Sequence, residues 1–500
     1  MSSVIPKPSA STAPVNKGLA TIKSPFAAAV LAVMFLISGS VAIYSGRILL
    51  TGEETDAIFN RLPQTCEWLS VADRPAQTGA VWQKALESAG LPDDVTPLLG
   101  SLGGRWLAVQ QAGQGLFDPA QPWAISAQSQ GILLAAPTLG PADVPTLTRL
   151  AHALLDGAWP DSQGHLGPSQ GLDGATCRVE ADRAQCQVGG QVRIAGQLKD
   201  KTWLFAIPWR KDTSALAFLH HAEAEAQRLP LQKNKPIREA LERVGGGQGH
   251  LFVSDVTLRN WVSARTSNDE VLEISRLSSW LALAVRQDDT EIAVHAHVGV
   301  GQKGAVWLKE RLDTQGKWDA TPLVLPQASA WLLTRVHPHG LVQHPDLPGV
   351  NSLATWARTY LELDLGPALA ATQGHSLWQS FPAVGGKTPW LLVAPAGAGA
   401  TATQLGKTVS WLPSDTGPLW LAASDAQTLA QAKAAYSGKL AAHESHFSSG
   451  QARLLTETQG LWLAPGALLG PWHGPVQAEW LWLDTGLVAE LSTAAPGAKR

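Results

Sequence analysis

The sequence predicts an α+β fold in which one N-terminal transmembrane helix precedes two tandem, diverged α+β repeats with largely antiparallel sheets. Three observations support this prediction: an uncharged apolar run near the N-terminus, an internal sequence repeat, and short strand-like segments that alternate with helical stripes. The length of 500 residues also exceeds what one ordinary hydrophobic core accommodates, which favours several structural units.

The apolar run predicts a membrane anchor. Residues 1–24 are rich in Ser, Pro, Thr and Ala and contain no acidic residue, so we expect a disordered cytoplasmic tail. Residues 26–46 carry no charge and would span about 31 Å as a helix, so residues 25–47 are predicted to cross a bilayer. Lysines precede the run, and Glu53 and Glu54 follow it. This bias predicts a single-pass protein of a bacterial inner membrane, with a cytoplasmic N-terminus and a periplasmic or extracytoplasmic bulk.

Two alternatives to an anchor stay open. The small residues Ser38, Gly39 and Ser40 resemble a signal-peptide cleavage site, so cleavage of the N-terminal segment is not decided. The run is also compatible with a buried core helix. The long polar lead and the length of the apolar run favour the anchor over both.

The cysteines predict one disulfide. Cys177 and Cys186 flank the segment CRVEADRAQC, and a hairpin that turns at Ala181 and Asp182 would place them opposite each other. In an oxidising compartment this proximity favours a Cys177–Cys186 bond. Cys66 is left over as a small buried residue of undecided redox state.

The internal repeat predicts a tandem duplication. LPQTCEWLSVADRP begins at Leu62 and LPQASAWLLTRVHP begins at Leu325, with Leu, Pro, Gln, Trp, Leu and Pro at identical spacing. Further matches follow in the same order along the chain. We therefore expect repeat 1 at 58–315, with an insertion at about 148–202, and repeat 2 at 320–494. The paired tryptophans are predicted to form a shared buried core: Trp68 with Trp331, Trp203 with Trp420, Trp261 with Trp472, and Trp280 with Trp480.

Local patterns predict the elements within each repeat. Short runs rich in Trp, Leu and Val predict strands at 66–72, 250–256, 330–336 and 418–424. Apolar residues spaced by three or four predict helices at 216–229 and 429–440. Many neighbouring strands are separated by turns too short for a crossover, which favours antiparallel pairing.

The arrangement resembles uncharacterised bacterial envelope proteins that combine one membrane anchor with repeated extracytoplasmic α+β units whose strands begin after a Leu-Pro step. The resemblance covers most of the chain on weak compositional motifs. It implies the anchored architecture but carries no activity and no catalytic residues.

Motifs for enzyme chemistry are incomplete in this sequence. Residues 167–171 match G-x-S-x-G but lack the flanking strand and helix that a nucleophile elbow requires. The Gly-Lys-Thr triplets at 386–388 and 406–408 have Phe381 and Thr401 where a phosphate loop needs glycine. We therefore predict no catalytic residue and no cofactor.

Histidines suggest a metal site only weakly. His295 and His297 share one face of a predicted strand, and His337, His339 and His344 cluster in a predicted loop. Paired histidines on a strand can bind zinc. No Asp or Glu stands within either cluster, so a solvated strand face and a polar loop are the favoured interpretations and no metal is predicted.

These observations favour a non-enzymatic binding or scaffolding protein of the cell envelope, held by one spanning helix and bound to another envelope protein. The net charge of −3 and the absence of a basic stripe argue against a nucleic-acid partner. Alternatives are an extracytoplasmic hydrolase with an unrecognised site and a glycan- or cell-wall-binding module that uses exposed tryptophans. Candidates for that surface role are the unmatched tryptophans Trp123, Trp159, Trp307, Trp318 and Trp356.

Overall fold

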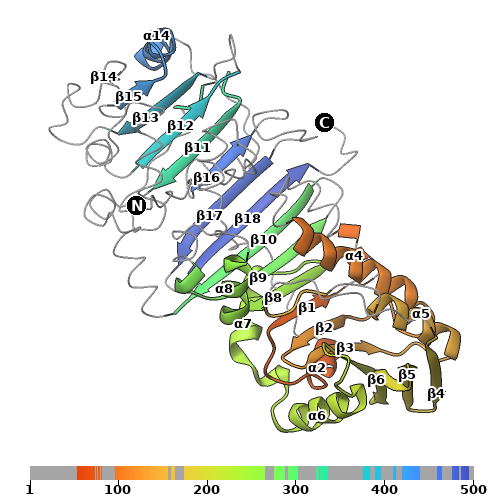
Figure 1. Cartoon of the computed structure of the whole chain (residues 1–500). Helices are drawn as coiled ribbons and strands as arrows, with labels where there is room; N and C mark the ends of the chain where they lie inside the picture. The colour runs from red at the N-terminus through yellow and green to blue at the C-terminus, as the bar shows by residue number, and fades with distance from the viewer. Residues whose placement is uncertain are drawn as a thin grey trace, which may run out of the picture.

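The structure is a computed structural model (Figure 1). It describes residues 53–73, 75, 77, 78, 80, 81, 96–155, 159–163, 174–264, 275–287, 291–301, 323–325, 327–335, 375–382, 389–395, 409–412, 419–439, 459–463, 476–483 and 486–494.

The described strands form one continuous 18-stranded sheet, and every pairing in it is antiparallel. From one edge, the first ten strands are β4 (Thr176–Glu180), β5 (Arg183–Val188), β6 (Gln191–Lys199), β7 (Thr202–Pro208), β3 (Gly131–Pro137), β2 (Trp123–Gln128), β1 (Trp68–Ala72), β8 (Gly249–Ser254), β9 (Ser278–Gln287) and β10 (Glu291–Val300). The sheet continues through β18 (Gly486–Ala494), β17 (Val476–Leu483), β16 (Gln459–Leu463), β11 (Ala330–Arg335), β12 (His375–Ser380), β13 (Trp390–Pro395), β15 (Leu419–Ala423) and β14 (Val409–Leu412).

The two halves of the sheet use the same strand order. In the first half it is β6-β7-β3-β2-β1-β8-β9-β10, and in the second half it is β14-β15-β13-β12-β11-β16-β17-β18. The last strands of the two orders, β10 and β18, pair with each other along the seam between the halves (Figure 1). Strands β4 and β5 belong to the first half and have no counterpart in the described strand order of the second half. The repeat boundaries at 58–315 and 320–494 remain a proposal, and this shared order supports it.

Helices cover both faces of the first half. Helices α4 (Thr96–Ala112), α5 (Val144–Leu155) and α8 (Asp255–Ser263) pack on the face that includes Trp68. Helices α2 (Glu53–Phe59), α6 (Ala215–Arg228) and α7 (Lys235–Val244), with the 3-10 turn η1 (Leu231–Lys233), pack on the opposite face. Each face therefore encloses its own apolar core.

The described part of the second half has one covering helix. Helix α14 (Ala426–Ala434) and the following turn η4 (Ala435–Lys439) pack on the face that contains Trp331, through Leu429, Ala432 and Tyr436. Burial raises the pKa of the Tyr436 hydroxyl, which donates a hydrogen bond to the Leu323 carbonyl.

The predicted fold class is wrong. Antiparallel strands dominate the described residues and join into one sheet, where the sequence suggested two α+β units behind an anchor. The error arises because hydrophobic periodicity reports local structure, whereas joining two halves edge to edge depends on contacts distant in sequence.

The predicted membrane placement is also corrected. The tail 1–24 and the segment 25–47 lie outside the described residues, and no helix that the structure describes is long and apolar enough to cross a membrane. The transmembrane helix and the single-pass periplasmic localisation are therefore withdrawn. An uncharged run sets only the length of a possible span and does not by itself establish a spanning helix.

The predicted disulfide is confirmed. Cys177 on β4 and Cys186 on β5 are register partners and are bonded to each other. Cys66 is a free, partly buried thiol just before β1. Its burial raises its pKa to about 12, so the thiol is protonated at neutral pH.

The matched tryptophans are largely internal where the structure describes them. Trp68, Trp331, Trp203 and Trp420 are each at most 1% exposed and Trp261 is 5% exposed, whereas Trp280 is partly exposed. Trp472 lies outside the described residues, and Trp480 is placed only by its backbone on β17.

The register separates one matched pair. Trp203 belongs to the same core as Trp68. Leu419 and Leu421 pack in the core of Trp331, so Trp420 between them lies on the opposite face of its strand. Sequence matching therefore pairs an indole inside the core of Trp68 with an indole that points away from the core of Trp331.

Candidate functional site

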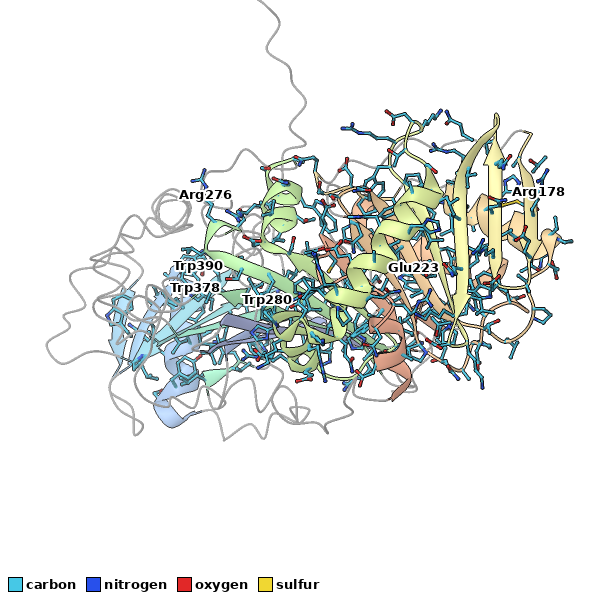
Figure 2. All side chains as sticks on the ribbon, turned by 90° about the horizontal axis from the view of Figure 1, so that it is seen from below. Arg178, Glu223, Arg276, Trp280, Trp378 and Trp390 are labelled. Carbon is cyan, nitrogen blue, oxygen red and sulfur yellow. A yellow bond between two sulfur atoms is a disulfide. The ribbon has the colours of Figure 1, made fainter. Side chains whose placement is uncertain are left out.

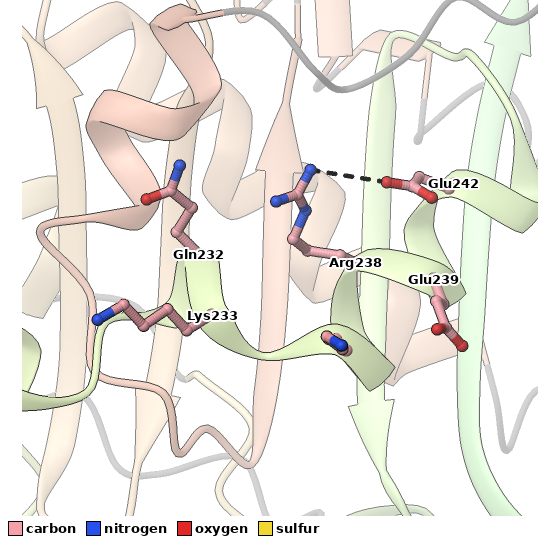
Figure 3. Close-up of a pocket in the computed structure, with 6 residues that line it drawn as sticks. Gln232, Lys233, Arg238, Glu239 and Glu242 are labelled. Atoms are coloured by element: carbon pink, nitrogen blue, oxygen red, sulfur yellow. Dashed lines mark ion pairs between the residues drawn. The ribbon is translucent and has the colours of Figure 1, made fainter.

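Among the described residues, a groove lies on the surface of η1 and α7 (Figure 3). Its volume is about 440 Å³. Charged side chains of both signs surround it. The lining residues are Gln232, Lys233, Lys235, Arg238, Glu239 and Glu242.

The local sequence explains why these side chains face outward. The side chain of Asn234 accepts a hydrogen bond from the Ile237 N–H and so caps α7, and Pro236 occupies its first turn. The apolar residues of α7 recur every three or four positions, which turns its charged residues to solvent. Arg238 Nη2 lies 3.8 Å from Glu242 Oε1 across one helical turn. The buried face consists of Ile237, Ala240, Leu241 and Val244.

Three buried histidines lie on the sheet face that α7 covers. His250 is fully buried, with Nε2 2.9 Å from the Gly245 carbonyl at the end of α7 and Nδ1 3.5 Å from Asp73 Oδ2. His295 and His297 lie on β10 and are 7% and 0% exposed. The solvated strand face favoured by the sequence is therefore wrong for this pair.

The surroundings of His297 hold its imidazole neutral. Its ring contacts Trp280 edge-on, with ring centroids 4.7 Å apart. Burial, followed by the nearby positive charge of Arg243, lowers the pKa of His297 to about 4.

The seam brings two acidic residues into the same row as His295. Glu490 on β18 is the direct register partner of His295, and Glu479 on β17 is the partner of Glu490. Directly paired residues lie on one face of a sheet, so the three positions share a face. Sequence analysis missed this row because no local pattern signals which distant strands pair. Among side chains that the structure describes, no three His, Cys, Asp or Glu gather as a metal cluster.

Other candidates from the sequence have clear outcomes. Trp123 and Trp159 are 1% and 3% exposed, so the surface role predicted for them is wrong. The remaining candidates fall outside the described residues: Trp307, Trp318, Trp356, the segment 167–171, the triplets 386–388 and 406–408, and the histidines His337, His339 and His344.

Comparisons with known proteins give little help. No family model and no curated protein matches the chain. Crystal form I of TP0453 matches at 8% identity with a TM-score of 0.26, covering 52% of this chain and 88% of that chain. Crystal form III gives the same identity and TM-score, covering 52% and 89%. At this TM-score the likeness carries no conclusion about fold or function, and the suspected resemblance to envelope proteins stays a prediction.

Proposed function

We propose that the chain is a non-enzymatic binding protein that holds a protein partner in the groove of η1 and α7. The observation that carries the proposal is the mixture of charges around that groove. Lys233, Lys235 and Arg238 supply positive charge, and Glu239 and Glu242 supply negative charge (Figure 3).

The lining favours a protein surface over a small molecule. Small-molecule sites enclose most of the ligand, whereas this groove is an open hollow between charged side chains. Charges of both signs favour a partner surface that carries the complementary charges. They also accelerate the encounter of that surface with the groove. The apolar side of α7 is packed on the sheet, so the helix presents these charges from a fixed support.

Photo-cross-linking from the groove tests the proposal. A photoreactive residue replaces Gln232 in one variant and Leu139 in a control variant. Leu139 is 59% exposed and belongs to the loop after β3. We expect a discrete adduct with a different protein from position 232 only. The same adduct should be lost when Lys233→Glu and Lys235→Glu are added, since both lysines are exposed and their reversal leaves the core intact.

Two results would contradict the proposal. One is equal labelling of the same proteins from positions 232 and 139, which indicates random collision. The other is an adduct that persists unchanged after the two lysines are reversed, because electrostatic complementarity would then play no part.

A second candidate, the glycan-binding module, has one observation in its favour. Trp378 on β12 and Trp390 on β13 are both partly exposed and lie side by side, with ring centroids 6.2 Å apart (Figure 2). Indole rings so placed can stack on flat sugar faces. Soluble cell-wall fragments should then quench tryptophan fluorescence in the native chain but not in a Trp378→Ala/Trp390→Ala variant; equal quenching in both excludes this candidate.

A further inference from the structure

Strand β4 forms one end of the sheet. Among the described strands it pairs only with β5, so its second edge carries backbone N–H and C=O groups that no described strand binds (Figure 1). Sheet edges of this kind are templates for pairing with another chain. The disulfide between Cys177 and Cys186 holds β4 on β5, so little further ordering is needed when a partner strand binds.

The spacing across the hairpin shows which residues face the free edge. Opposite residues in an antiparallel pair alternate between hydrogen-bonded pairs, with Cα atoms about 5.5 Å apart, and non-hydrogen-bonded pairs at about 4.5 Å. The Cα atoms of Cys177 and Cys186 are 4.1 Å apart, which makes theirs a non-hydrogen-bonded pair. The backbone groups of Cys177 and, two residues later, of Val179 therefore point away from β5. Those of Arg178 point toward β5.

The side chains of β4 alternate between its two faces. Cys177 and Val179 are half-buried against the core on the face that α5 covers, whereas Arg178 and Glu180 are exposed on the opposite face. Figure 2 shows Arg178 at the end of the molecule. These two opposite charges are two residues apart, and within the described chain neither forms an ion pair or a side-chain hydrogen bond.

Two copies of β4 that pair antiparallel, with Val179 opposite Val179, use both features at once. The two Val179 residues then exchange N–H···O=C bonds, because each presents its backbone groups to the edge. Arg178 of each copy faces Glu180 of the other in a non-hydrogen-bonded pair, where side chains approach most closely. Within its own hairpin Glu180 lies opposite Arg183, so each carboxylate stands between two arginines.

The neighbouring two-fold registers are repulsive. Centring the pair on Arg178 places two arginines directly opposite each other, and centring it on Glu180 does the same with two glutamates. A single kind of charge on an edge strand repels a second copy and protects the edge. The ordered pair of Arg178 and Glu180 instead attracts a second copy in one register.

We propose that β4 is a self-association edge, at which a second copy of this chain pairs antiparallel about Val179 and extends the sheet across a two-fold axis. Such a contact uses the same residues on both copies and closes at two. It spans a strand of 5 residues in each copy and buries little surface, so the dimer dissociates on dilution. This interaction goes beyond partner binding in the groove of η1 and α7 and does not depend on it.

Charge reversal in the full chain tests the edge. Sedimentation equilibrium measures the dimerisation constant of the native chain and of the variants Arg178→Glu and Glu180→Arg. Both changes are at exposed positions and leave the apolar cores intact. We expect each variant to weaken dimerisation at least about ten-fold, because the symmetry makes both cross-strand contacts repulsive.

A mixture of the two variants gives the sharper measurement. A dimer of one Arg178→Glu copy and one Glu180→Arg copy again has opposite charges at both contacts. We expect the mixture to dimerise as tightly as the native chain, a result that misfolding of either variant cannot give. The control Arg228→Glu makes the same change of charge at an exposed residue of α6, away from β4, and should leave dimerisation unchanged.

Four outcomes would overturn the proposal. The native chain would stay monomeric over the whole concentration range, or it would grow into assemblies larger than a dimer. Alternatively, the two reversals would leave the dimerisation constant unchanged, which places the contact elsewhere. Finally, the mixture would associate no better than the separate variants, which means that Arg178 and Glu180 do not face each other across the contact.

Discussion

The two halves of the sheet place their strands in the same order but present different side chains from them. Trp68 on β1 and Trp331 on β11 occupy the same place in that order, and each belongs to the core under its own helices. Trp203 and Trp420 are also matched in sequence, yet they lie on opposite faces relative to those cores. A shift of one residue along a strand is enough to produce this difference, because side chains alternate between faces. The two halves thus share their strand order, whereas the register of matched residues within the strands differs between them.

The additions to the first half show a second difference. Strands β4 and β5 extend its sheet beyond the shared order and are stapled by Cys177–Cys186. In the described part of the second half the sheet ends at β14, which occupies the place of β6. The first half therefore has an extra hairpin at an edge where sheets are otherwise liable to fray or to pair with other chains.

Removal of the matched tryptophans should give the largest loss of stability in each half. We expect Trp68→Ala and Trp331→Ala each to lower the free energy of unfolding by about 3–5 kcal/mol, because each ring is at most 1% exposed. Trp68 also donates a hydrogen bond to the Pro160 carbonyl at 2.9 Å, so its loss should fall at the upper end. Urea denaturation gives the total loss, and hydrogen exchange shows which half opens.

Trp280→Ala serves as the control because Trp280 is only partly buried. It should cost less than either core substitution. If Trp331→Ala proves as mild as Trp280→Ala, the two tryptophans are not equivalent and the correspondence of the halves is lost.

The disulfide should have the next largest effect, confined to the first half. Its loop closes over a sequence separation of 9, for which the chain-entropy estimate gives about 2–3 kcal/mol. A Cys177→Ser/Cys186→Ser variant should lose about this amount in urea denaturation, with faster hydrogen exchange in β4 and β5. Reduction of the native chain should reproduce the result, since Cys66 forms no disulfide. An equal loss of hydrogen-exchange protection in β14 would contradict the prediction that the disulfide stabilises the first half alone.

The same contrast shows what sequence can and cannot predict. The cysteine hairpin was predictable because its register depends on a short turn between residues close in the chain. The seam between β10 and β18 was not, because edge-to-edge pairing of distant strands has no local signature. For that reason the row of His295 and Glu490 also escaped sequence analysis. Repetition of Trp identified equivalent strands, but it did not fix their register to one residue, as Trp203 and Trp420 demonstrate.

The helix that follows β7 in one half and β15 in the other should respond differently to acid. Ser214 caps α6 by accepting a 3.4 Å hydrogen bond from the Ala217 N–H, whereas Asp425 caps α14 by accepting a 2.8 Å bond from the Thr428 N–H. Burial opposes ionisation of Asp425, but the hydrogen bonds from Thr428 and Ser424 outweigh it and lower its pKa. An ionised cap should therefore stabilise α14 above the unfolded pKa of about 3.9, and this stabilisation is lost as pH falls through the lower folded pKa.

Cap substitutions measure that contrast. Asp425→Ala should cost about 1–2 kcal/mol at pH 7 and Ser214→Ala about 0.5 kcal/mol, as the lengths of their bonds suggest. Asp425→Ser gives the second half the cap of the first and should flatten the dependence of stability on pH below 4. A pH profile that is identical for the native chain and Asp425→Ser would contradict the role of the carboxylate.

The smallest effect is expected at the groove, and it separates binding from folding. Arg238 and Glu242 are 33% and 39% exposed and lie 3.8 Å apart, so their ion pair is screened by water and should contribute about 0.5 kcal/mol or less. Arg238→Ala/Glu242→Ala should leave the unfolding midpoint almost unchanged, yet lower the yield of the Gln232 cross-link several-fold, because charge complementarity at a binding surface acts on the encounter rather than on the fold. A matched arginine–carboxylate pair one helical turn apart and outside the groove is Arg259 with Asp255 on α8, and its removal should leave the cross-link yield unchanged. If the groove variant lowers the unfolding midpoint as much as a core variant does, α7 depends on its outer charges for stability. The charges around the groove are then explained by folding and not by binding.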